Sequence, residues 1–116
     1  MLFENLAFGS IRVDGVEYDH DIVVERGEVR ARKKGPSKVF RSQFGHTPLT
    51  TSEEIPWQCH RLIIGTGIYG RLPVDLDVQR EAEHRKVELV MIPTQQAITL
   101  LNEQPAHTNA ILHLTC

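Results

Sequence analysis

Residues 61–70 read RLIIGTGIYG, a short apolar run followed by a glycine-rich turn. Such a run is typical of a buried strand, and Gly65 ends it. Apolar side chains then recur at Val74, Val78 and Ala82, and this spacing predicts an amphipathic helix over residues 75–86. A strand followed by a helix of this kind begins a right-handed crossover to a parallel neighbouring strand.

The rest of the C-terminal half continues the same alternation. A second apolar run predicts a strand over 87–92, and because it is nearly continuous we expect that strand to be buried on both faces. Thr94 is placed to cap a helix over 95–104, and a last strand is expected over 110–115. The order strand, helix, strand, helix, strand predicts a small parallel sheet.

In the N-terminal half, apolar and polar residues alternate as they do in β-strands. Alternating apolar residues and two turn dipeptides, Asp14-Gly15 and Arg26-Gly27, predict a meander of three strands over 10–13, 17–25 and 28–33. Residues 40–51 are expected to form a loop, and Thr51-Ser52-Glu53-Glu54 fits the capping box of a short helical turn. The prediction is one α/β domain over residues 1–116, with three layers. Its central mixed sheet has a βαβαβ C-terminal half, and the N-terminal antiparallel meander packs against that sheet.

Composition narrows the function classes. Thirteen Lys and Arg against 15 Asp and Glu leave a net charge of −2, which argues against binding to nucleic acid over the whole surface. The apolar runs are too short for a membrane span, and residues 1–8 lack the pattern of a secretory signal. Two cysteines are too few for a disulfide framework. We therefore expect a cytoplasmic domain.

The turn Gly65-Thr66-Gly67-Ile68-Tyr69-Gly70 matches the G-x-G-x-x-G pattern of dinucleotide-binding folds. Two further requirements of that pattern fail. Residues 71–74 separate the turn from the helix, and the next strand ends in Met91-Ile92-Pro93-Thr94 without an acidic residue for a ribose hydroxyl. We interpret the turn as a tight strand-exit loop.

That loop still lies where parallel sheets bind ligands, beyond the carboxyl ends of the strands. Arg71 would supply a positive charge, Tyr69 an aromatic wall, and the helix after Thr94 free backbone amides. The sequence therefore suggests a small-anion site here. Its candidate residues are Gly65, Thr66, Gly67, Tyr69, Arg71, Thr94 and Gln95. The alternative, that Thr94 only caps its helix and Arg71 is solvated, stays open.

The cysteines and histidines suggest neither a metal nor a nucleophile. Cys59-His60 precedes the first parallel strand and Cys116 follows the last, which puts them at opposite edges of the sheet, so we assign no metal site. A catalytic Cys116 would need a base, and His46 is the one candidate, in a loop of uncertain position. We assign no catalytic residue and interpret His113 as a hydrogen-bonded core histidine.

Charge is unevenly distributed in the N-terminal half. Residues 14–25 hold five acidic residues and no Lys or Arg, whereas residues 26–41 hold seven basic residues, from Arg26 to Arg41, and only Glu28 as an acid. Two explanations are open: a docking patch for an acidic partner or nucleic acid, or opposite charges paired across neighbouring strands. We favour the pairing and regard nucleic-acid binding as the weaker explanation.

Several short motifs in a fixed order resemble a known family. They are Leu62–Gly67, the segment Pro93–Ile98, the ending His113–Cys116, and His46-Thr47-Pro48. The chain is similar to the small Mth-type domain family over nearly its whole length. The resemblance implies an α/β domain with an added β layer, and no established enzymatic activity, cofactor or catalytic residue. It also implies that eukaryotic members act through partners, as assembly or regulatory proteins.

The leading prediction is a cytoplasmic, non-enzymatic binding or assembly module that uses no cofactor and acts through a protein partner. The alternative is a protein or enzyme that binds a small anion or metabolite at the Gly65–Arg71 loop and the helix after Thr94. A partner surface should expose apolar residues such as Trp57 or Tyr69, and an enzyme should have a concave pocket with convergent polar groups. A homodimer through an edge strand of the meander is left open.

Overall fold

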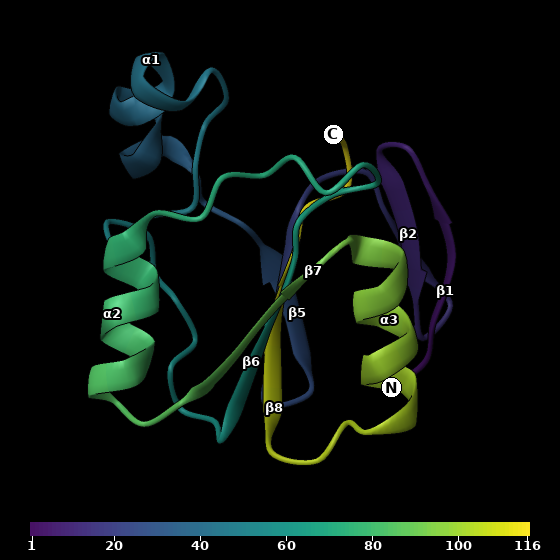
Figure 1. The fold of residues 1–116 in the computed structure, drawn as a ribbon. Coiled ribbons are helices and arrows are strands. Elements are labelled where there is room, and N and C mark those ends of the chain that lie inside the picture. The colour runs from purple at the N-terminus through teal and green to yellow at the C-terminus, as the bar shows by residue number, and fades with distance from the viewer.

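The computed structural model describes all 116 residues and places eight strands, two longer helices and two short helical segments (Figure 1). The strands are β1 (Phe3–Ala7), β2 (Ser10–Val13), β3 (Val16–Tyr18), β4 (Ile22–Glu25), β5 (Glu28–Ala31), β6 (Arg61–Gly65), β7 (Glu88–Ile92) and β8 (Thr108–Leu112). The helices are the 3-10 helix η1 (Gly35–Phe40), α1 (Arg41–Phe44), α2 (Leu76–His84) and α3 (Thr94–Glu103). None of them is long and apolar enough to span a bilayer.

The central sheet is mixed, as the sequence predicted. Its strand order is β5-β4-β8-β6-β7. Strand β6 pairs in parallel with both β7 and β8, whereas β4 pairs antiparallel with β5 and β8. A separate antiparallel sheet holds β1, β2 and β3. The hairpin β4–β5 therefore extends the central sheet beyond its parallel strands, next to β8.

Three layers follow from the two crossovers. The connection from β6 to β7 runs one way across the central sheet, and the connection from β7 to β8 runs back the other way, past β6. Because both connections are right-handed, α2 and α3 lie on opposite faces of that sheet. Helix α3 and the β1–β3 sheet share one apolar core, and α2 with the loop before β6 shares the other (Figure 1). The fully buried residues Ile63 and Ile64 of β6 point into the two different cores. The predicted three-layer architecture is confirmed.

The N-terminal half differs from the predicted meander. The expected strand 17–25 is broken, because β3 ends at Tyr18 and β4 begins at Ile22. Between them, Asp21 uses its carboxylate to accept a hydrogen bond from the amide of Leu114, 2.9 Å away. The two parts belong to different sheets, and β1, which the alternation did not reveal, completes the outer one.

Three local expectations are also wrong. The capping-box stretch 51–54 forms no helix, because Glu53 is buried and binds Arg32. The expected loop 40–51 contains α1. Strand β7 lies at the sheet edge, where Met91 is 40% exposed, so it is not buried on both faces. The run of apolar side chains indicated a strand there but not its position in the sheet.

Thr94 does not cap its helix. It is the first residue of α3, after the N-cap Pro93, and is fully buried. Its hydroxyl donates to the carbonyl oxygen of His113 at 2.6 Å and accepts from the amide of Gly67 at 2.9 Å. Thr94 therefore joins the strand-exit loop of β6 to the end of β8.

The glycine loop packs against the C-terminal segment, residues 113–116. The amides of Ile68 and Arg71 donate to the carbonyl oxygens of Thr115 and Cys116, at 2.7 and 3.0 Å. Gly67 has φ +110°, and a Cβ there would lie 2.4 Å from the carbonyl carbon of Cys116. The chain itself therefore fills the place that a phosphate occupies in a dinucleotide-binding loop.

This close approach makes Gly67→Ala a severe substitution. We expect it to lower the free energy of unfolding by about 3 kcal/mol, because backbone strain and a clash with Cys116 add together. Gly15→Ala is the matched control: Gly15 has φ +80° with no atom within 4 Å of a Cβ, so only strain of about 1 kcal/mol is expected. Urea denaturation measures both, and equal losses would contradict the packing argument.

Candidate functional site: a basic cleft at the carboxyl ends of the strands

A cleft of about 340 Å³ lies between residues 34–47 and the C-terminal segment. Figure 1 shows α1 standing beyond the upper end of the central sheet, on the same side as the C-terminus. The lining contains no Asp or Glu, and its basic residues are Arg32, Lys34, Lys38, Arg41, His46, Arg71 and His113. The cleft is therefore strongly cationic, although the whole chain carries a net charge of −2.

Most of these cations have no carboxylate partner. Lys34, Lys38, Arg41 and Arg71 form no ion pair, and all four are exposed. The cross-strand pairing expected for the basic segment holds for Arg30, which reaches Glu25 at 3.6 Å between neighbouring strands. It does not hold for the cations around η1, whose charge faces the cleft.

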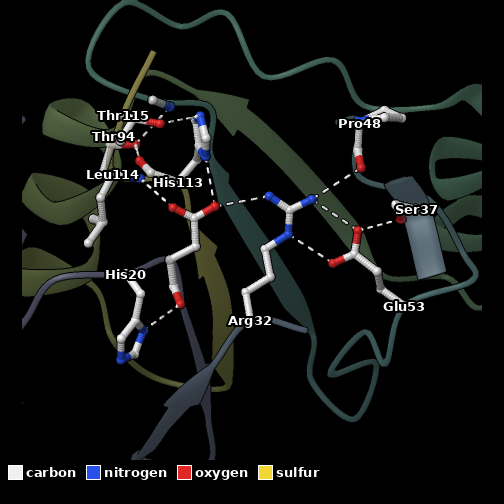
Figure 2. A network of polar contacts seen from close by, with 11 residues as sticks. His20, Arg32, Ser37, Pro48, Glu53, Thr94, His113, Leu114 and Thr115 are labelled. Carbon is white, nitrogen blue, oxygen red and sulfur yellow. Dashed lines mark hydrogen bonds and ion pairs between the residues drawn. The ribbon is translucent and has the colours of Figure 1, made fainter. Parts of the chain in front are cut away.

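Arg32 is a buried residue of the cleft lining. Figure 2 shows the contacts of its guanidinium. Its guanidinium binds Glu53 through two bonds, Nε to Oε1 at 2.8 Å and Nη2 to Oε2 at 3.0 Å. It also donates to Oδ2 of Asp21 at 3.0 Å and to the carbonyl oxygen of Pro48 at 3.1 Å. Ser37 of η1 donates to Oε2 of Glu53 at 2.6 Å, so the network ties η1 to the sheet.

Asp21 also holds His113 in place. Its Oδ2 lies 2.7 Å from Nδ1 of His113, and Nε2 of that ring lies 3.2 Å from Oγ1 of Thr115. An ionised carboxylate only accepts hydrogen bonds, so Nδ1 of His113 carries a proton that it donates to Asp21. The two contacts fix the orientation of the imidazole at the edge of the cleft.

Burial and pairing act in opposite directions on the two charged groups of this network. Burial raises the pKa of Asp21, but His113, the Leu114 amide and Arg32 together outweigh it and lower the pKa below 3.8. Burial likewise lowers the pKa of Arg32, and Glu53 and Asp21 raise it above its ordinary value. Both groups are therefore held in their charged forms.

The structure separates the predicted site residues into three groups. Arg71 lines the cleft, and Tyr69 lies beside it with 66% of its surface exposed. Gly65, Thr66, Gly67 and Thr94 are buried, and the polar groups of Gly67 and Thr94 already bond within the chain. Gln95 is exposed but does not line the cleft, so the start of α3 adds no amides to it.

Sequence reasoning missed most of the cleft. Lys34, Lys38 and Arg41 were noted only as part of a basic segment. Their placement depends on η1, which the loop-like composition concealed. His46 and Cys116, considered as a base and a thiol, do both line the cleft. His113 is hydrogen-bonded as predicted, to Asp21, but it follows β8 and lines the cleft instead of lying in the core.

A larger hollow of about 500 Å³ lies at the opposite end of the sheet, around Cys59, His60 and His107. Its one Lys or Arg, Arg26, is bound to Gln58. Burial is the main cause that raises the pKa of the Cys59 thiol. The parallel register pairs Arg61 with Thr108, so this hollow is far from Cys116, as the topology predicted. It has no cluster of free cations, and the basic cleft is the better candidate site.

The fold and cleft define a small three-layer α/β domain with a cationic cleft at the carboxyl ends of its strands. Residues 3–112 match the model of a family described as protein of unknown function (DUF498/DUF598), and the chain belongs to that family. The resemblance to Mth-type domains is confirmed. No curated protein matches the chain.

Solved structures with similar folds agree with this family assignment. The conserved hypothetical protein PH1505 from Pyrococcus horikoshii OT3 is 30% identical, with a TM-score of 0.83 and 100% of both chains covered. The protein designated MT938 is 28% identical, with a TM-score of 0.74, over 99% of this chain and 98% of that chain. A Bordetella pertussis protein described as a Mth938-like domain is 17% identical with a TM-score of 0.62, over 97% and 85% of the two chains, and shows the fold alone.

Removing Arg32 should destabilise the domain strongly. Arg32→Met leaves the carboxylates of Glu53 and Asp21 without their cation, and we expect a loss of about 3–5 kcal/mol in the free energy of unfolding. The control is Glu81→Gln, which breaks an exposed pair with Arg85 and should cost no more than about 1 kcal/mol. Similar losses in denaturant titrations of the two variants would show that the buried network is dispensable.

The lowered pKa of Asp21 predicts a pH dependence. Its ionised form stabilises the fold fully above the unfolded pKa of 3.8, and this contribution is lost as pH falls through the lower folded value. The stability difference between wild type and Asp21→Asn should therefore shrink below about pH 3.8. Melting temperatures between pH 2 and 7 test this, with the exposed Asp19→Asn as control. A difference that stays constant across this range would contradict the assignment.

Proposed function

We propose that this domain binds a multiply charged anionic ligand in its basic cleft. The observation that carries the proposal is the concentration of four unpaired cations, Lys34, Lys38, Arg41 and Arg71, in one cleft of an acidic protein. Repulsion among like charges opposes their gathering there unless an anion compensates for it. A cytoplasmic location suits the proposal, because both cysteines are free thiols.

The buried network supports the proposal because it shows which cations of the cleft are already neutralised within the protein and which are free to bind an anion. The charge of Arg32 is compensated by Glu53 and Asp21, so that residue braces the wall. The remaining cations are exposed and keep their charge for a ligand. The Coulomb attraction between one such cation and a unit negative charge 4 Å away is about 1 kcal/mol in water, and it is larger where the cleft excludes solvent.

A partner protein with an acidic segment is the second candidate, because exposed apolar side chains adjoin the same cleft. Val39, between the cleft residues Lys38 and Arg41, is 75% exposed, and Tyr69 is 66% exposed. Trp57, the other residue expected on a partner surface, is partly buried under the guanidinium of Arg85. Binding of a polyglutamate peptide, with no binding of inorganic triphosphate, would favour this candidate.

Calorimetric titration with inorganic triphosphate tests the leading proposal. The double variant Lys38→Gln/Arg41→Gln should weaken binding about tenfold or more, because two cations leave the cleft. The control Arg12→Gln/Lys86→Gln removes the same charge from exposed positions elsewhere and should change affinity little. Equal weakening in both variants would indicate unspecific charge attraction, and absence of binding to the wild type would refute the proposal.

A further inference from the structure

Two exposed aromatic rings lie together beside the basic cleft. Phe8 is 58% exposed and Tyr69 66% exposed, with ring centroids 6.2 Å apart and planes tilted by 42°. These are large exposed aromatic surfaces in a chain with only 6% aromatic residues. Their loops meet because Gly9 donates to the carbonyl oxygen of Leu114 and Ile68 to that of Thr115, both at 2.7 Å. The segment that lines the cleft thus also positions the two rings.

Arg71 connects the aromatic pair to the cleft. Its Cζ lies 5.9 Å from the centroid of the Tyr69 ring, and its side chain lines the cleft. Its amide donates to the carbonyl oxygen of Cys116, which fixes the backbone between ring and cleft. A cationic surface and an aromatic surface therefore share one residue, and a single ligand can contact both.

We propose that the ligand is a nucleoside polyphosphate, with its phosphates among Lys34, Lys38 and Arg41 and its base stacked on Tyr69. This inference rests on the proposed anion binding and adds the chemical class. A phosphate chain alone leaves the aromatic pair in water, whereas a nucleotide has several negative charges and a flat ring within one molecule. The multiple charges match the unpaired cations around η1.

This binding mode differs from that of a dinucleotide fold. The amides of Ile68, Tyr69 and Arg71 already donate to oxygens of Thr115 and Cys116, so the glycine loop has no free cradle for phosphate. The phosphates are assigned to side chains of η1 and α1 instead. Since every base offers a stacking face, we expect ATP and GTP to bind with affinities within a few-fold of each other.

Calorimetry with ATP and with inorganic triphosphate, at one ionic strength, tests the inference on the full chain. Tyr69→Ala should weaken ATP binding about tenfold or more and leave triphosphate binding unchanged, since only the stacking contact is lost. Tyr69→Phe keeps the ring and should retain wild-type affinity. Leu76→Ala, at a side chain 58% exposed outside the cleft, is the control for removing exposed apolar surface.

The outcomes distinguish this inference from the proposal on which it rests. If Tyr69→Ala leaves ATP binding unchanged, or weakens ATP and triphosphate equally, the nucleoside assignment is overturned while anion binding stands. If neither ATP nor triphosphate binds the wild type, both fall. Selective loss of ATP affinity in Tyr69→Ala, restored in Tyr69→Phe, supports the assignment.

Discussion

The buried guanidinium of Arg32 is the constraint on which the cleft depends. It binds carboxylates from two different loops, Asp21 before β4 and Glu53 before β6, and also the carbonyl oxygen of Pro48. Ion pairs of this kind add little net stability over an apolar core, but one partner without the other is costly. Conformations that separate these loops are therefore unfavourable, and the arrangement around η1 is specified by charge as well as by apolar packing.

The C-terminal segment holds neighbouring loops in place through its backbone, as Arg32 does through its side chain. Its carbonyl oxygens accept hydrogen bonds from amides of the glycine loop and of the β1–β2 turn, and the Thr94 hydroxyl donates to the carbonyl oxygen of His113. The side chains of His113, Thr115 and Cys116 then form one wall of the cleft. The glycine motif, whose sequence suggests phosphate binding, is thus structural here. The cations that line the cleft come instead mainly from η1, α1 and Arg71.

The sequence predicted the crossover half of the fold well, because its helices and strands have clear periods and are bounded by Pro, Gly and Thr. It predicted a site at the end of the sheet where the basic cleft lies, and Arg71 lines that cleft with Tyr69 beside it. That a ligand binds in this cleft is our proposal. It could not separate paired from unpaired cations, since Arg32 meets Glu53 across 21 positions of sequence. Nor could it assign Glu53 correctly, because a buried acid and a capping acid look alike in a short polar stretch. The break at Asp21 is likewise set by contacts with residues 113 and 114.

The segment that carries most of the cations of the cleft buries few of its residues. Between residues 34 and 47 only Ser37 is buried, while Lys34, Lys38, Arg41 and His46 are exposed side chains on a short helical arch. Substitutions there leave both apolar cores intact. Residues 34–47 can therefore be substituted without disturbing either core, so the charge of the cleft can be redesigned at little cost to folding.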